Sequence, residues 1–323
     1  MAINFDAMAD WENAAWAANK PMIVSGVDRS KISKANTGWF NNHTGGSISN
    51  ITDDSVITNA QVRAYDRFGS LTVAAEAASG TTPTFTVQFN ALAAGETLEF
   101  DTVVILGHNF HSLNSSPKHV FLNVDDGSGT NTLMADTITL VDNKRLIYTH
   151  LYDRGSSKPT YPQRVRISGT GAIPKLHVRP ANVTYSGANI KPQLGEVWIG
   201  KRSQLMHNPN LPFDDKAEIS LTSEFSSQSG VTNRYVRHRG KALRTIAKSI
   251  TDSNELAGVE RAFDEADEFT APFMYIENPA QSAPDGFLML SDSASLSLPL
   301  QGPTERILQM SMTEQPPFKS QES

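Results

Sequence analysis

The stretch that decides the fold class of this chain is Phe100-Asp-Thr-Val-Val-Ile-Leu-Gly-His-Asn-Phe110. Val103 to Leu106 form an unbroken apolar run that is rich in β-branched residues and too short for a helix. Such a run is typical of a strand buried on both faces. The residues that follow, Gly107, His108 and Asn109, favour a sharp turn. We therefore expect a central strand that ends in a turn.

A second stretch far downstream has a related pattern. In Leu194-Gly-Glu-Val-Trp-Ile-Gly200, Leu194, Val197 and Ile199 alternate with smaller or polar neighbours, and the stretch ends on glycine. Alternation of this kind is typical of a strand with one face in a core. We expect the two stretches to be walls of one β-domain.

Further strands recur at short intervals between and beside these two stretches. The clearest spans residues 82–90, where three apolar residues alternate with threonine and glutamine. Arg164 and Arg166 alternate with apolar residues and are expected to point outward. No helical period separates the strands, which favours a β-sandwich or jelly roll over an α/β sheet. The other strands of this part are expected at residues 55–65, 70–76, 121–124, 133–141, 146–151, 164–168 and 175–179.

The N-terminal segment combines a short helix with a long loop region. Residues 9–19 place alanine and tryptophan at helical spacing, and Pro21 closes them before a short strand. Two interpretations of the helix stay open, since it could pack on its own chain or dock on a neighbouring subunit. Residues 28–54 are rich in Asn, Gly, Ser and Thr, which predicts loops around Trp39 and Phe40.

The second half of the chain is predicted to place one helix among strands. Residues 201–215 contain two prolines and little periodicity, so they are the candidate linker. Asp252 and Glu255 have the spacing of a capping box, which predicts the start of the helix. The apolar stripe of that helix consists of Leu256, Val259, Phe263 and Ala266. Strands are expected at residues 217–223, 233–238, 242–250, 273–277, 287–291 and 307–314.

A basic segment and the outer face of this helix have complementary charge. Residues 234–244 are the densest positive segment of the chain. They could be the solvated face of strands, or they could meet the acidic helix face of the next subunit in a ring. The residues expected on that outer face are Glu260, Arg261, Asp264, Glu265 and Asp267. The candidate subunit-contact residues are Arg234, Arg237, Arg239, Lys241, Asp264 and Glu265.

Length and composition narrow the function classes. At 323 residues the chain can bury a sizeable core and form about two domains by the prior of one per ~150 residues. It has no cysteine, which excludes disulfides, thiolate catalysis and cysteine-based zinc sites. The 28 lysines and arginines against 34 aspartates and glutamates give a net charge of −6, which argues against nucleic acid as a partner. No apolar run approaches the ~20 residues of a membrane-spanning helix, and no secretory signal is visible.

The sequence lacks several common motifs of catalysis and cofactor binding. It has no Gly-x-Ser-x-Gly elbow, no Gly-x-x-x-x-Gly-Lys-Ser/Thr loop and no His-Glu-x-x-His pair. His108 and His111 are three residues apart, but we expect the His108 ring and Asn109 to hydrogen-bond their own turn. Residues 125–129 could present oxygens to calcium, although they lack the spacing and terminal glutamate of an EF-hand loop. We expect no catalytic residue, no metal ligand and no cofactor.

These features together resemble proteins of bacteriophage tails. The buried strand ending in Gly-His-Asn, the polar loop, a Tyr/Arg-rich strand and the closing Gly195-Glu-Val-Trp-Ile-Gly200 resemble the galactose-binding-like (discoidin-like) jelly-roll domains of these proteins, over about residues 48–201. Residues 230–314 resemble the domain of phage distal-tail and tail-tip proteins in which strands and one helix end in Pro272-Phe-Met-Tyr-Ile-Glu277. The resemblance implies a mainly β chain with an N-terminal jelly roll and a smaller α+β domain of the tail-ring type.

The resemblance also implies a function and partners. It implies a structural virion protein, made in the host cytoplasm, that forms a homo-oligomeric ring at the distal end of the tail. A hexamer is favoured over a trimer, and the ring would link the tail tube to the hub, tip or fibres. The expected organisation is an N-terminal arm and loop region at 1–47, the jelly roll at 48–201, a linker at 202–216, the ring-forming domain at 217–314 and a flexible tail at 315–323.

The alternative function is a carbohydrate-binding module or a glycan-active protein that contacts the host surface. Trp39, Phe40 and His43 are candidate glycan contacts, because sugar C–H faces are apolar and sugar hydroxyls need polar partners. The same aromatic pair could instead plug the core of its own chain. Carboxylate pairs for sugar cleavage are recognised by their separation in space and have no fixed sequence spacing. Jelly rolls host many functions, so fold class alone does not decide between these possibilities.

Overall fold

The computed structural model describes the chain in a series of ranges. They are residues 2–27, 31–34, 60–61, 85–89, 92–106, 108, 110–112, 118–127, 132–141, 146–151, 161–169, 174–180, 193–194, 196–208, 214–226, 232–266, 272–280, 286–291, 298–300 and 305–314. The fold is mainly β, as the sequence predicts. The jelly-roll topology and the division into two folding units stay predictions.

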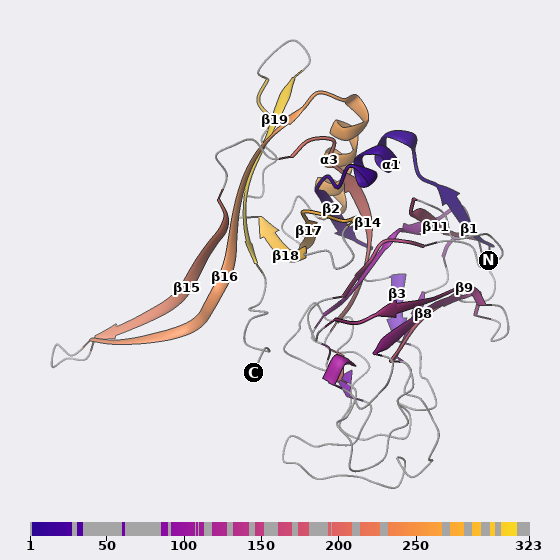
Figure 1. Cartoon of the computed structure of the whole chain (residues 1–323), viewed down its shortest axis with the longest axis horizontal. Coiled ribbons are helices and arrows are strands. Elements are labelled where there is room, and N and C mark those ends of the chain that lie inside the picture. The colour runs from indigo at the N-terminus through magenta and orange to yellow at the C-terminus, as the bar shows by residue number, and fades with distance from the viewer. Residues whose placement is uncertain are drawn as a thin grey trace, which may run out of the picture.

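One large antiparallel sheet runs through both halves of the chain (Figure 1). It has nine strands in the order β10 (Leu146–Tyr148), β7 (Thr102–Leu106), β14 (Glu196–Gln204), β2 (Met22–Gly26), β17 (Phe273–Ile276), β18 (Gly286–Ser291), β19 (Arg306–Glu314), β16 (Thr232–Ile250) and β15 (Asp214–Ser226). Strand β7 lies between two neighbours, so the expected central strand is confirmed.

Strand β14 joins the two halves of this sheet. Its first part, Glu196–Gly200, pairs with β7, and its second part, Gly200–Gln204, pairs with β2. Residues 202–204, expected at the start of a linker, are therefore strand residues and are buried. Their polar sequence carried no strand signal, because the side chains buried here are polar ones: Ser203 donates to the backbone oxygen of Gly258, and Gln204 donates to that of Lys20.

Three smaller antiparallel sheets complete the described structure. The first has the order β1 (Ala2–Ala7), β11 (Gln163–Ser168) and β6 (Thr97–Phe100). The second has the order β3 (Ile32–Lys34), β5 (Phe85–Phe89), β12 (Lys175–Pro180), β8 (His119–Asp125) and β9 (Thr132–Thr139). The third pairs β13 (Gln193–Leu194) with β4 (Ala60–Gln61).

Strand β1 was not predicted from the sequence. It is an edge strand in which Ile3 and Phe5 alternate with Asn4 and Asp6 and pack against a hydrophobic core, and its ladder with β11 stabilises it. An ion pair between Asp6 and Arg166 adds to that contact. The following helix, α1 (Asp10–Ala17), buries Ala15 and Trp16 and packs Trp16 edge-on against His150 at 4.7 Å. The N-terminal segment thus packs on its own chain, the first of the two interpretations.

The first core lies between the sheets of the N-terminal half. Val103 and Ile105 enter it from β7, and Val197 and Ile199 enter it from β14. The rings of Phe89 and Phe100 stack there at 5.3 Å. The intervening residues of the same strands, Val104 and Trp198, are buried on the opposite face of the large sheet with methionines and aliphatic residues of β2 and β17. The prediction that this strand is buried on both faces is confirmed.

The second core lies between α3 (Ser253–Glu265) and the large sheet. Val259 and Ala262 are fully buried in it, and Leu256 and Phe263 pack against it from its edge, so the predicted helix and its stripe are confirmed. Asp252 caps the helix by accepting hydrogen bonds from the backbone N–H groups of Asn254 and Glu255. The second half of the predicted capping box is wrong, because the Glu255 side chain is buried against Lys248 instead of returning to Asp252.

The C-terminal half also contains a long hairpin. The sequence predicts two strands at 233–238 and 242–250, but β16 is one strand of 19 residues. Irregular pairing with β15 on both sides of Leu221 accommodates the segment around Gly240, which explains why the glycine does not end the strand. Figure 1 shows β15 and β16 extending together as a curved ribbon beyond the other strands of the sheet.

Candidate functional site

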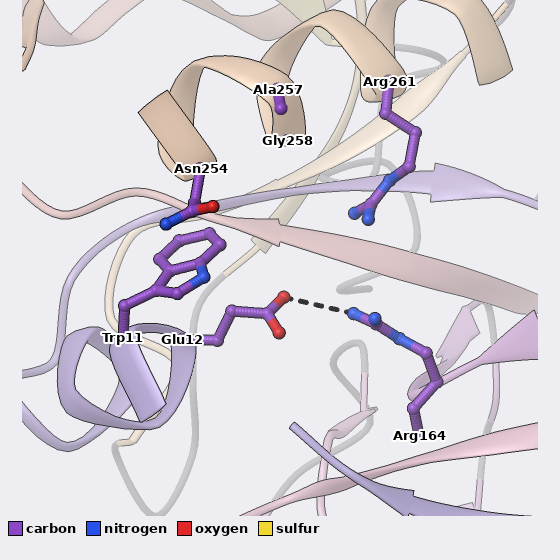
Figure 2. A pocket seen from close by; sticks show the side chains of 7 residues that line it. All are labelled: Trp11, Glu12, Arg164, Asn254, Ala257, Gly258 and Arg261. Carbon is purple, nitrogen blue, oxygen red and sulfur yellow. Dashed lines mark hydrogen bonds and ion pairs between the residues drawn. The ribbon is translucent and has the colours of Figure 1, made fainter. Parts of the chain in front are cut away.

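A small polar pocket lies between α1, α3 and β11. Its hollow measures about 290 Å³. We call it the α1–α3 pocket, and Figure 2 shows its lining. The lining residues are Trp11, Glu12, Arg164, Asn254, Ala257, Gly258 and Arg261.

Helical periodicity explains how α3 contributes to the pocket. Asn254, Ala257, Gly258 and Arg261 are separated by the three- and four-residue steps that place side chains on one face of a helix. This face differs from the one that carries Val259 into the core. Helix α3 is held on the sheet at this point, because the backbone carbonyl of Gly258 accepts a hydrogen bond from the Ser203 hydroxyl at 2.7 Å.

Arg164 is the centre of a buried network of charges on the other wall. Its Nε donates to Asp101 Oδ2 at 3.1 Å, and its Nη2 donates to Glu12 Oε1 at 3.2 Å. The second oxygen of Glu12 accepts from the backbone N–H of Ala9 at 3.2 Å. Burial alone would lower the pKa of Arg164, but Asp101 and Glu12 raise it above its usual value. Arg164 therefore stays charged although α1 covers it.

Arg202 joins this network through its backbone but not through its side chain. Its backbone N–H donates to Asp101 Oδ1 at 3.0 Å, and its side chain is fully buried. Its three guanidinium nitrogens make no hydrogen bond within the described part of the chain. Burial lowers the pKa of Arg202, and Asp101 and Glu12 oppose that effect. A buried guanidinium without acceptors adds positive potential behind the pocket.

Arg261 enters the pocket from the opposite side and is anchored at one nitrogen. Its Nη2 donates to the backbone oxygen of Arg202 at 2.7 Å and to Ser203 Oγ at 2.9 Å. Its ion pair with Glu265 is long, at 3.8 Å from Nε to Oε1. Figure 2 shows Arg261 and Arg164 pointing into the same space from two elements. The pocket therefore offers two guanidinium groups, an indole, an amide and one carboxylate.

A second buried charge cluster lies at the start of α3. Lys248 Nζ donates to Glu255 Oε1 at 2.6 Å, and both side chains are inaccessible to solvent. The same oxygen accepts from the backbone N–H of Met206 at 2.8 Å. Burial lowers the pKa of Lys248, and Glu255 opposes that effect. The pair joins β16, α3 and the end of β14, which indicates a structural role.

The described structure places some predicted site residues and not others. Trp39, Phe40 and His43, the candidate glycan contacts, lie outside the described residues. Of the candidate subunit contacts, Asp264 is exposed on α3. Glu265 contacts Ser25 and lies 3.9 Å from Lys201 Nζ, so it also takes part in contacts within its own chain. The basic candidates Arg234, Arg237, Arg239 and Lys241 all lie in β16.

Two predicted orientations are wrong. Arg164 was expected to point outward, but α1 covers it and leaves its side chain 16% exposed. Arg261 was expected on the outer face of α3, but it reaches the backbone of β14. Both errors have the same cause. Each arginine is covered by a segment that is distant in sequence, and the local pattern of charged and apolar residues does not reveal such a segment.

The turn residues have the local roles that their sequences suggest. His108 is buried, and its Nδ1 accepts from the backbone N–H of Phe110 at 3.3 Å, which confirms the prediction for its ring; Asn109 lies outside the described residues. Asp125 accepts from the backbone N–H of Gly127 at 2.7 Å and pairs with His177. Across the described residues, no group of three or more His, Cys, Asp or Glu side chains could hold a metal ion.

The pocket residues were not singled out by the sequence. Trp11 and Glu12 look like ordinary helix residues, and the alternation around Arg164 is typical of a solvent-facing strand.

Among the described helices, none has the length and apolar character that a membrane-spanning helix needs. No family model, no curated protein and no solved structure matches the chain.

Proposed function

We propose that this protein is a structural subunit of a bacteriophage tail that forms a ring near the distal end and links the tail tube to the tip or fibres. The motif resemblance of both halves supports the proposal. The observation that carries it is the β15–β16 hairpin, which is built as a projecting arm.

The hairpin extends beyond its support in the sheet. Eight residues of β16, Leu243–Ile250, pair with β19, and the remaining eleven lie alongside β15 alone within the described structure. Eleven extended residues span roughly 35 Å. A two-stranded ribbon of this kind is marginally stable in water by itself. Contact with another chain would supply the burial that the arm lacks.

The edge of the arm is also suited to assembly. Strand β15 is the last strand of the nine-stranded sheet, and its outer edge pairs with no strand that the structure describes. A long unpaired edge is a template for another chain. Because the arm is one patch and its receiving surface is another, repeated contacts of this kind close into a ring or continue as a filament.

Charge supports the same contact. The eleven residues beyond β19 include Arg234, Arg237, Arg239 and Lys241, whereas the chain as a whole has a net charge of −6. Glu260 and Asp264 are exposed on α3 and could receive them. Attraction between unlike patches of two copies favours a defined encounter and is weakened by salt.

Deletion of the arm tests the proposal. Residues 222–237 would be replaced by Asn-Gly, which joins the paired residues Leu221 and His238 by a short turn. We expect the full chain to form a ring, hexameric or trimeric, in mass photometry and the shortened chain to be a monomer with unchanged melting of the remaining fold. A full chain that stays monomeric at micromolar concentration, or a shortened chain that still forms the ring, would contradict the proposal.

The alternative, a carbohydrate-binding or glycan-active protein, is favoured by a different observation. The outward face of the five-stranded sheet carries Asn123, His177 and Arg179, and the Arg179 guanidinium lies 4.6 Å from the centre of the Phe121 ring. Planar polar groups beside an aromatic ring are the parts from which sugar-binding faces are made. A monomer that binds host glycans through this face would support the alternative.

A further inference from the structure

We propose that the α1–α3 pocket binds a single carboxylated sugar unit of the hexuronic acid class. The inference rests on the residues of the pocket and does not depend on assembly into a ring. It also differs from the sheet-face alternative, because the pocket lies at α1 and α3 and not on β8 and β12.

The charges of the pocket call for an anion on the side of Arg261. Arg164 is balanced by hydrogen bonds to two carboxylates, Asp101 and Glu12. Arg261 has one distant carboxylate at 3.8 Å, and its short hydrogen bonds go to neutral oxygens. Because Arg164 is already balanced, Arg261 is the guanidinium of the pocket beside which a further anion would be favoured. A carboxylate is the natural acceptor, because it matches the planar fork of arginine.

Unused donors strengthen this reading of the charges. The Nε of Arg261 is buried and makes no hydrogen bond within the described part of the chain. The guanidinium of the neighbouring Arg202 is buried in the same condition. A buried donor without an acceptor is costly, and an anion bound beside the Nε of Arg261 would recover part of that cost. Arg202 does not line the pocket, so it would interact with the anion only through its charge.

The remaining walls fit the ring of a sugar. Trp11 offers a large apolar ring face, on which the C–H groups of a pyranose can pack. Asn254 offers an amide that can both donate and accept, and Glu12 has acceptor sites beyond the two that Arg164 and Ala9 use. A hydroxylated ring therefore finds partners that a simple carboxylate does not.

The size of the pocket limits the ligand to one unit. Its volume of about 290 Å³ is just below the ~300–1,000 Å³ that is typical of ligand pockets. An acidic side chain of another protein would satisfy the two arginines. It would leave Trp11 uncovered and would offer no hydroxyl to Glu12 or Asn254, so the sugar acid is the better match.

Direct binding to the full chain tests the proposal. D-glucuronate, D-glucose, acetate and L-glutamate would be titrated by isothermal calorimetry, and saturation-transfer NMR would show whether sugar ring protons contact the protein. We expect glucuronate to bind, and the other three, each lacking the ring or the charge, to bind about tenfold more weakly or not at all.

Two variants and a matched control locate the binding. Arg261→Gln removes the less balanced guanidinium, and we expect it to weaken glucuronate binding about tenfold. Asn254→Ala alters an exposed lining residue without touching the anchoring of α3, and it should weaken binding by a smaller factor. Arg166→Gln is the control, because Arg166 lies on the same strand as Arg164 but pairs with Asp6 and does not line the pocket.

The outcomes separate the possibilities. Binding that both pocket variants weaken and the control does not would support the proposal. Equal binding of glucose and glucuronate would overturn it, since the arginines would then not be reading a carboxylate. Tighter binding of glutamate would overturn it in favour of an acidic side chain as occupant. Mass photometry on the same samples reports the ring separately, so a failure here leaves the proposed function standing.

Discussion

Lys248 and Glu255 form an ion pair that solvent does not reach, and this makes each of them dependent on the other. Removing two charges from water is costly, and the pair recovers that cost only while both partners are present. The backbone N–H of Met206 also donates to Glu255, so the carboxylate holds three segments together. The contribution of this pair to stability is therefore visible mainly when one partner is lost.

We predict that Glu255→Gln destabilises the protein by roughly 3–5 kcal/mol, because it leaves the buried ammonium group of Lys248 without a counter-charge. Urea unfolding followed by circular dichroism measures the change. Glu260→Gln is the matched control on the exposed side of α3, and its free energy of unfolding should change by about 0.5 kcal/mol or less. Equal effects of the two substitutions would show that the pair has no special role.

At the scale of single elements, two glycines show how the same change can have opposite effects. A Cβ added to Gly258 in α3 would meet Ser203 Cβ at 3.7 Å and Trp11 at 3.9 Å, which are ordinary contact distances. A Cβ added to Gly200, where β14 passes from β7 to β2, would lie 2.5 Å from Val24 Cγ1 and 2.6 Å from the backbone oxygen of Ser25.

We predict that Gly258→Ala stabilises the protein by up to ~1 kcal/mol, since alanine favours a helix and fits the space. Gly200→Ala should destabilise it by roughly 1–3 kcal/mol or more, since backbone atoms must move. Differential scanning calorimetry of both variants should give melting temperatures that shift in opposite directions. A Gly200→Ala variant as stable as the natural chain would mean that β14 and β2 are less closely packed than described.

The element scale also shows what the sequence can and cannot predict. The apolar run of β7 and the stripe of α3 are local patterns, and they predicted a buried strand and a helix correctly. The exposure of Arg164, the partner of Glu255 and the continuity of β16 depend on segments far away in the sequence. The pocket was missed for the same reason, because Trp11, Arg164 and Arg261 are brought together only by the packing of three elements.

At the scale of the whole molecule, the two halves of the chain are joined through a shared strand. Val197 and Ile199 at one end of β14 lie in the first core, and Leu205, directly after β14, lies in the second. Helix α3 packs on the later part of β14 and on β2. Contacts of this extent should couple the halves even if each is a folding unit of its own.

We predict that limited proteolysis cuts the chain first between Met206 and Asp214 and that the two fragments stay together. The segment contains Pro209 and Pro212 and no apolar periodicity, whereas Leu205 is buried and the Met206 N–H is bound to Glu255. The ladder between β2 and β17 and the anchoring of Arg261 on β14 would hold the fragments after the cut.

Subtilisin at low concentration, followed by mass spectrometry and size-exclusion chromatography, should give two fragments that elute as one species. First cuts inside β14 would argue against a boundary here, and fragments that separate without denaturant would show that the shared sheet does not hold the halves together.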